Sequence, residues 1–308
     1  MPTPDFLDPR LTERRNPRTA AIDTASSLDI VDLLNAEDRT VPEAVGRCRT
    51  DIARAIDLAL EAFRAGGRLL YVGAGTSGRL GVLDAAECPP TFGSPPEMVV
   101  GVIAGGYPAL VKSQEGAEDD VNAGMAAMDA QRVTEKDLVV GIAASGTTPF
   151  VRAALSRAQT IGATTALLTC ADPPEILART CDLLIVVRVG PEALTGSTRL
   201  KAGTATKLVL NTITTGAMVR LGKAYGNLMV DLVALSDKLR DRGERIVMEA
   251  GGVDRPKARA AIDAARGSVK VAVVMARRGI ARDDAVRLLE KAGGVTRAAA
   301  GDPPPVFP

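Results

Sequence analysis

The sequence contains no histidine at all. This absence removes the commonest general base and the usual metal ligand, and it excludes every Ser-His or Cys-His nucleophile pair. Acid–base catalysis, if there is any, therefore falls to Asp, Glu, Lys, Tyr or Cys. The four cysteines lack the spacing of a metal site, so we expect reduced thiols, no metal and a cytoplasmic protein; they are Cys48, Cys88, Cys170 and Cys181.

Strong charge and long apolar runs are also missing. A net charge of +1 over 308 residues gives no reason to expect nucleic acid or an acidic membrane surface as a partner. No apolar run approaches the length of a membrane span. The proline- and arginine-rich start of the chain has no apolar core, so we do not expect a secretory signal.

A glycine-rich turn follows the apolar run 69–72, which has the pattern of a buried parallel strand. Apolar residues recur at helical spacing after the turn. Glycines let the backbone approach an anion, and a helix N-terminus offers free N–H groups. We therefore predict a phosphate cradle, and the alternative is an ordinary strand–helix turn capped by Ser77. The expected cradle residues here are Gly75, Thr76, Ser77 and Gly78.

A second hydroxyl-rich turn follows the apolar run 138–143 and precedes a helix expected over 149–161. Further strand-like runs cover 98–103, 163–169 and 183–187. Strands that alternate with helices predict an α/β fold with a doubly wound, five-stranded parallel sheet. Ligands bind such sheets at the carboxyl ends of the strands, so the second turn joins the candidate site with Ser145, Gly146, Thr147 and Thr148.

The rest of the chain suggests three regions: an N-terminal arm with helices over 1–58, the sheet domain over 59–222, and a small helical appendage over 223–308. A basic cluster of Arg199, Lys201 and Lys207 could hold a phosphate or carboxylate, or could be a solvated helix start, and we expect Lys201 to bind the substrate. The helix expected over 208–218 is apolar nearly all round, which places it in a core or a subunit interface and suggests a homodimer.

Four motifs in the chain resemble the N-acetylmuramic acid 6-phosphate etherases, which belong to the sugar isomerase (SIS) domain families. They are YVGAGTSGRLGVLDAAECPPT (71–91), EGAEDD (115–120), GIAASGTTP (141–149) and GPEALTGSTRLKAGTATK (190–207). The last motif is shared with the glucokinase regulatory protein, whereas DAAECPP and EGAED point to the etherase branch. The resemblance spans nearly the whole chain.

The resemblance implies cleavage of the lactyl ether of N-acetylmuramic acid 6-phosphate to N-acetylglucosamine 6-phosphate and D-lactate, in the recycling of cell-wall sugars, without metal or organic cofactor. A base removes the C2 proton of the open-chain sugar, lactate leaves from C3 with protonation, and water adds. The two glutamates of the family's motifs correspond to Glu87 and Glu118. SIS relatives commonly place such sites at subunit interfaces.

The residues themselves agree with two carboxylates as the acid–base pair, because histidine is absent. Glu87 precedes Cys88-Pro89-Pro90, so we expect a helix end there whose dipole favours the protonated acid. A straight helix would put Glu87 about 15 Å from Ser77, at 1.5 Å per residue. Either the helix breaks near Gly81, or Glu87 serves a site completed by the neighbouring subunit.

Two other functions use the same turns. An aldose–ketose isomerase for a sugar phosphate would need one glutamate base and no acid for a leaving lactate. A non-enzymatic sugar-phosphate sensor would keep the Ser/Thr turns and could lose either glutamate without effect.

Overall fold

The computed structural model describes residues 10–175, 181–232 and 237–305. The chain forms two compact units. The first comprises residues 1–86 and 97–214, and the second comprises residues 87–96 and 215–308. Each unit is described by itself below.

The first unit is built on a five-stranded sheet in the order β2-β1-β3-β4-β5, in which every neighbouring pair is parallel. This confirms the predicted α/β class and the five strands. All residues of β1 and β3 are buried, as the continuous apolar runs require. The strands are β1 (Leu69–Gly73), β2 (Val99–Ile103), β3 (Leu138–Ile142), β4 (Thr164–Thr169) and β5 (Leu183–Val186).

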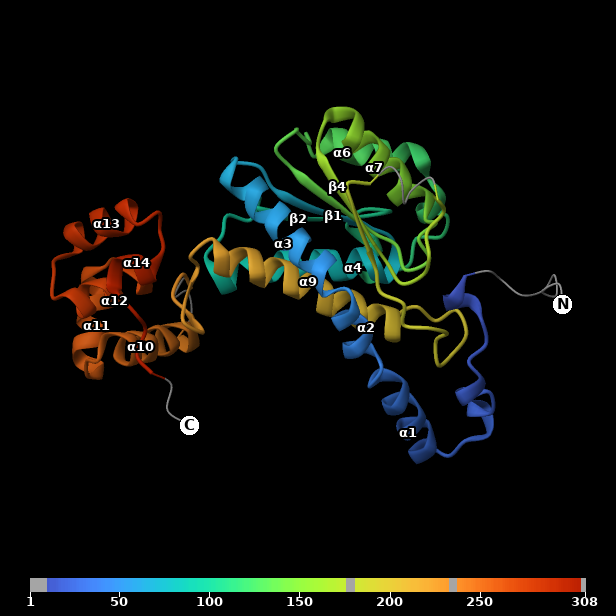
Figure 1. Ribbon diagram of the computed structural model, residues 1–308, viewed down its shortest axis with the longest axis horizontal. Coiled ribbons are helices and arrows are strands. Elements are labelled where there is room, and N and C mark those ends of the chain that lie inside the picture. The colour runs from blue at the N-terminus through green and yellow to red at the C-terminus, as the bar shows by residue number, and fades with distance from the viewer. Residues whose placement is uncertain (1–9, 176–180, 233–236, 306–308) are drawn as a thin grey trace. The chain divides into compact units, whose positions relative to one another are not determined.

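Helices cover both faces of this sheet (Figure 1). Leu70 and Val72 point to one face, where they join a buried cluster with Met128 of α6 and Phe150 of α7. Tyr71 points the other way, toward α4. The helices of the sheet domain are α3 (Arg49–Arg64), α4 (Gly75–Phe92), α5 (Pro108–Val111), α6 (Val121–Ala130), α7 (Pro149–Ile161) and α9 (Lys201–Arg220), with the 3-10 turn η4 (Ala117–Asp119).

Helix α4 lies unusually close to the sheet because two glycines allow it. A Cβ built at Gly101 of β2 would lie 2.5 Å from the Cα of Val82 on α4. A Cβ built at Gly81 of α4 would lie 2.9 Å from the Cβ of Tyr71 on β1. Gly81 therefore serves backbone packing, and the alternative of a helix broken near it is excluded, since α4 is one continuous helix.

The expected helix end after Glu87 is also wrong, because α4 continues through Pro89 and Pro90 to Phe92. Neither proline has an N–H to donate, so the last turn lacks two intrahelical hydrogen bonds. The side chains of Cys88 and Phe92 are buried. Packing of this segment thus outweighs the local preference of the prolines.

The N-terminal region consists of short 3-10 turns followed by helices. Ser26 caps the first helix with a complete capping box to Asp29. Cys48 stands between two helices that follow each other directly, as the C-cap of one and the N-cap of the next. The elements are η1 (Leu11–Glu13), η2 (Pro17–Thr19), η3 (Ile22–Thr24), α1 (Ser27–Asp38) and α2 (Val41–Arg47).

The second unit is helical and has its own core, which includes Val247, Ala272 and Val273. Its helices agree with the helical appendage expected at the C-terminal end of the sequence. Its elements are the hairpin β6 (Ala224–Tyr225) and β7 (Leu228–Met229), with α10 (Asp237–Gly251), α11 (Arg255–Ala264), α12 (Val269–Arg278), α13 (Arg282–Lys291) and α14 (Thr296–Ala300). Among the described residues of both units, no helix combines the length and apolarity needed to cross a bilayer.

We expect Gly101→Ala to lower the free energy of unfolding by about 1–3 kcal/mol, because the new methyl group meets the α4 backbone and forces it away from the sheet. Gly46→Ala in α2 is the matched control. A Cβ there has nothing within 4 Å, and alanine is the better helix former by up to about 1 kcal/mol. Urea titration followed by circular dichroism measures both, and equal stability changes would contradict the close approach.

Candidate active site

The carboxyl edge of the sheet brings the two hydroxyl-rich turns together. Gly73 at the end of β1 pairs in register with Ile142 at the end of β3. The strand order places a topological switch point between these two strands, because β1 is followed by β2 on one side and β3 lies on the other. The turns that follow β1 and β3 therefore start side by side at the usual ligand-binding edge.

The first turn is shorter than the sequence suggests, because α4 already begins at Gly75. Thr76, Ser77 and Gly78 thus belong to the first helical turn. The Gly78 N–H donates to the Ala74 carbonyl at 3.3 Å, whereas the N–H groups before it have no intrahelical acceptor. A Cβ at Gly73 would lie 2.7 Å from the Gly78 nitrogen, so only glycine allows this turn to close so tightly.

The second turn is stabilised by its own hydroxyls. The hydroxyl oxygens of Ser145 and Thr147 lie 2.9 Å apart and share a hydrogen bond. The Thr147 N–H donates to Ser145 Oγ at 3.3 Å. Thr148 stands at the N-cap of α7, yet its side chain accepts no capping hydrogen bond. Gly146 adopts a positive φ of 72°, in the left-handed region that favours glycine.

A pocket of about 320 Å³ adjoins the start of α4 and contains Glu118 among its lining residues. Its volume is at the lower end for small-molecule sites. Asp120, two residues after Glu118, has a structural role: it caps α6 by accepting from the Ala123 N–H at 2.8 Å. The pocket is lined by Ala74, Gly75, Arg79, Ala104, Ala109, Ser113, Gln114, Glu115, Gly116, Ala117 and Glu118.

Glu87 lies on α4 in the segment that belongs to the second unit, and its side chain is exposed. With the broken helix excluded, the remaining explanation for its distance from the phosphate turn is a site completed by the neighbouring subunit, which stays a prediction.

One turn earlier on α4, Asp84 is buried and accepts from Asn211 Nδ2 at 2.6 Å and from the Thr214 hydroxyl at 3.2 Å, both on α9. Burial raises the pKa of Asp84.

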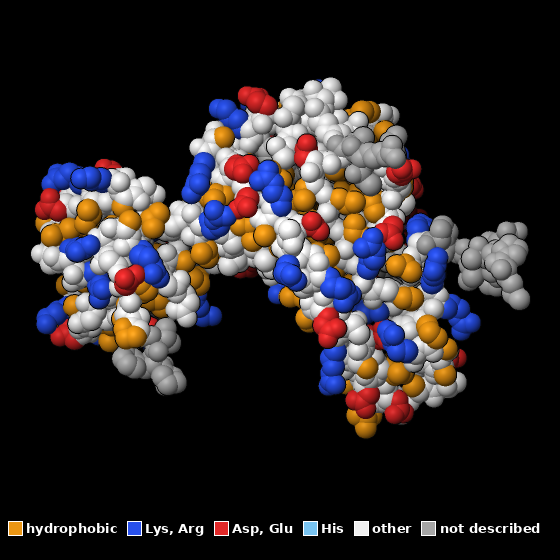
Figure 2. Space-filling model, viewed as in Figure 1, with side chains coloured by type: hydrophobic (Ala, Val, Ile, Leu, Met, Phe, Trp, Pro, Cys, Tyr) orange, Lys and Arg blue, Asp and Glu red, His pale blue; other side chains and the backbone are white. Residues whose placement is uncertain are grey.

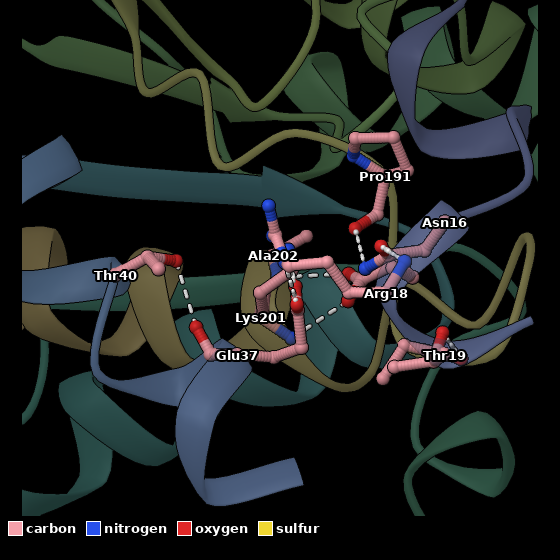
Figure 3. A network of polar contacts seen from close by, with 10 residues as sticks. Asn16, Arg18, Thr19, Glu37, Thr40, Pro191, Lys201 and Ala202 are labelled. Atoms are coloured by element: carbon pink, nitrogen blue, oxygen red, sulfur yellow. Dashed lines mark hydrogen bonds and ion pairs between the residues drawn. The ribbon is translucent and has the colours of Figure 1, made fainter. Parts of the chain in front are cut away.

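Lys201 is buried and its ammonium group is held by a carboxylate (Figure 3). Its Nζ donates to Glu37 Oε2 at 2.6 Å, and Glu37 also accepts from the guanidinium of Arg18. Asn16 and Thr19 of the same N-terminal segment donate to the carbonyls of Pro191 and Ala193. This network fastens the N-terminal segment to the start of α9, although Lys201 was expected among the substrate-binding residues.

The N-terminus of α9 is capped from within the chain. Glu192 is fully buried and accepts from the N–H groups of Lys201 and Ala202, each at 2.9 Å. The motif 190–207 thus supplies its own anion to the helix N-terminus. The other two residues of the basic cluster, Arg199 and Lys207, are exposed.

The sequence arguments did not single out Glu37, Asp84, Glu192 or Arg79. Lys201 lies 164 positions from Glu37, and Asn211 lies 127 positions from Asp84, so no local pattern could reveal these contacts. Arg79 did carry a signal. It lies four residues after Gly75 in a helix, hence on the same face as the start of the cradle.

One family model and several known proteins are similar to this chain. The family model of the glucokinase regulatory protein N-terminal SIS domain matches residues 51–159. The N-acetylmuramic acid 6-phosphate etherase of Serratia proteamaculans is 53% identical over 289 residues, which cover 94% of this chain and 97% of that protein. The enzyme of the same name from Edwardsiella ictaluri is 50% identical over 95% of this chain and 97% of its own length. Among solved structures, a phosphoheptose isomerase from Neisseria gonorrhoeae aligns with a TM-score of 0.49 and 20% identity, over 62% of this chain and 99% of that one.

We expect Glu37→Gln to lower the free energy of unfolding by about 3 kcal/mol or more at pH 7, because it leaves the buried Lys201 ammonium without its counter-charge. Glu61→Gln is the control. Glu61 forms an exposed ion pair with Arg54 at 3.2 Å, and loss of such a pair costs less than about 1 kcal/mol. Urea titration compares the two variants with the parent protein.

The same pair predicts a pH dependence. The hydrogen bond from Arg18 is the main cause that lowers the pKa of Glu37 from its ordinary 4.5 to about 2. The stabilisation is therefore complete above pH 4.5 and is lost as the pH falls toward 2. The stability gap between the parent protein and Glu37→Gln should narrow over this range. A gap that stays constant down to pH 2 would contradict the assigned pairing.

Proposed function

The chain belongs to the N-acetylmuramic acid 6-phosphate etherases, and from this we infer that it is a carbon–oxygen lyase that cleaves the D-lactyl ether of N-acetylmuramic acid 6-phosphate. The products are N-acetylglucosamine 6-phosphate and D-lactate, and the reaction serves the recycling of cell-wall amino sugars. The observation that carries this inference is identity of 50% or more over at least 94% of the chain. It favours neither an aldose–ketose isomerase nor a non-enzymatic sensor.

We propose that Glu118 is the base that removes the C2 proton of the open-chain aldehyde. The electron pair of the C–H bond is first held by the aldehyde as an enolate. It then forms the C2–C3 double bond while the C3–O bond breaks. Glu87 gives its proton to the departing lactate oxygen, and water then adds at C3 to yield the free sugar. The support for Glu118 is its place on the wall of the pocket at the carboxyl edge. The assignment of Glu87 rests on its motif.

The hydroxyl-rich turns are proposed to hold the phosphate. Thr76, Ser77 and Gly78 present the N-terminal turn of α4, which favours an anion. Ser145, Gly146, Thr147 and Thr148 follow β3 at the switch point. Lys201 is also predicted to bind the substrate, but the structure gives this no support because the ammonium group of Lys201 is held by Glu37.

We propose that the enzyme is a cytoplasmic homodimer that works without metal or organic cofactor. The apolar residues of α9 give no support to the dimer, because Val209, Leu210 and Ile213 are already buried within the chain. Support comes from α1, where Leu28 and Val31 are 70% and 57% exposed. They stand three residues apart, hence on one helix face. Figure 2 shows hydrophobic side chains at the surface of this part of the molecule.

The two glutamates are separated by following lactate release and C2–H exchange in deuterated buffer. Glu118→Gln should abolish both, because no base remains. Glu87→Gln should abolish lactate release and retain exchange, because the base and the aldehyde that acidifies C2 are intact. General acid–base groups contribute about 10²–10⁴-fold, so an ordinary lactate assay with proton NMR resolves each loss. Lactate release at the parental rate by both variants would disprove the mechanism.

Light scattering tests the dimer and its surface. We expect the protein to have twice the mass of one chain, and the double variant Leu28→Ser and Val31→Ser to have the mass of one chain, because it removes an exposed apolar face. Val111→Ser, at a residue that is 85% exposed on α5, is the control and should keep the dimer. A parent protein with the mass of a single chain argues against this arrangement.

A further inference from the structure

Arg79 is the cation in the lining of the pocket that contains Glu118. It lies on the second turn of α4, and its side chain is half-buried. Its Nε donates to the carbonyl oxygen of Leu110 at 2.9 Å. This bond fixes the plane of the guanidinium and leaves its two terminal nitrogens as the remaining donors. Such a fixed fork matches the two oxygens of a carboxylate.

The pocket and the proposed substrate both carry negative charge, which a cation at this place would offset. Two carboxylates, Glu115 and Glu118, line the pocket with Arg79. The substrate of the proposed reaction brings two more anionic groups, the 6-phosphate and the lactyl carboxylate. Like charges in a half-enclosed site repel one another. A guanidinium that meets one of the substrate's anionic groups offsets this repulsion.

The geometry favours the lactyl carboxylate over the phosphate. Of the proposed phosphate-binding residues, only Gly75 is among those that line this pocket; Thr76, Ser77 and the turn 145–148 are not. The lactyl oxygen is attached to C3, directly beside the C2 atom from which Glu118 removes the proton. The group that shares the pocket with the base should therefore belong to the lactyl end of the substrate.

We propose that Arg79 binds the lactyl carboxylate through its terminal nitrogens and so selects sugar phosphates that carry an acidic ether at C3. The inference rests on the proposed function, because it uses Glu118 as the C2 base. Arg79 holds the leaving lactyl group while the C3–O bond breaks. It contributes nothing to sugars that have a free hydroxyl at C3.

The test compares Arg79→Gln with the parent enzyme on two substrates, N-acetylmuramic acid 6-phosphate and its lactamide, in which a neutral carboxamide replaces the carboxylate. With the acid, we expect kcat/KM to fall roughly 10²-fold, the size of a lost charge-assisted bidentate contact. With the amide, the variant and parent should differ by less than about threefold, because the ionic contact is already absent. Arg79→Lys keeps the charge without the fork and should be intermediate.

Inhibition by N-acetylglucosamine 6-phosphate identifies the anion that Arg79 meets. This sugar has the phosphate but no lactyl group, so its inhibition constant should be the same for the parent and for Arg79→Gln. Arg64→Gln is the matched control. Arg64 is exposed at the last residue of α3, shortly before the amino end of β1, and does not line the pocket. It should behave as the parent in both assays.

Equal loss with the acid and the amide, or a raised inhibition constant, would overturn the proposal and would indicate a structural or phosphate-binding role for Arg79. A parent enzyme that releases no lactate would instead overturn the proposed function. The two failures are therefore distinguishable. Thermal unfolding of each variant shows that a lost activity does not come from a lost fold.

Discussion

The backbone contact between α4 and the sheet is the constraint on which the candidate site depends. Gly81 on the helix and Gly101 on β2 remove the side chains that would hold the two surfaces apart. The helix can then begin immediately after β1, in a turn that Gly73 and Gly78 close. This places the free N–H groups of its first turn at the carboxyl edge of the sheet, and Arg79 one turn further along.

The start of α9 has a different role from the one that its basic residues suggest. Glu192 accepts from the helix N-terminus, and Glu37 pairs with the Lys201 ammonium. The positive helix end and the positive side chain are therefore both balanced within the chain. A buried ion pair contributes less to stability than its short distances suggest, because both charges lose their hydration. Its main effect is to hold the N-terminal segment and the loop before α9 in one arrangement. The side chain of Thr76 lies close to Gly203 on α9, so this junction adjoins the hydroxyl-rich turn after β1.

The sequence was sufficient for features that depend on local pattern. Apolar runs such as 69–72 and 138–143 predicted buried parallel strands, and the two hydroxyl-rich turns lie at the carboxyl edge of the sheet as expected. Their binding of a phosphate stays a prediction. Features that depend on distant contacts were out of reach. The apolar residues on α4 do not reveal that packing carries the helix past Pro89 and Pro90. Lys201 looked available for a ligand because its partner, Glu37, is 164 positions away.

We propose that the substrate lies with its phosphate on the hydroxyl-rich turns and its lactyl end in the pocket that contains Arg79 and Glu118. A crystal structure of Glu118→Gln with bound N-acetylmuramic acid 6-phosphate tests this directly, because the variant lacks the base and retains the rest of the pocket. We expect the lactyl carboxylate to lie within hydrogen-bonding distance of the Arg79 guanidinium, C2 to face residue 118, and the phosphate to lie at Ser77 and Thr147. Substrate bound in the opposite orientation, or outside this pocket, would contradict it.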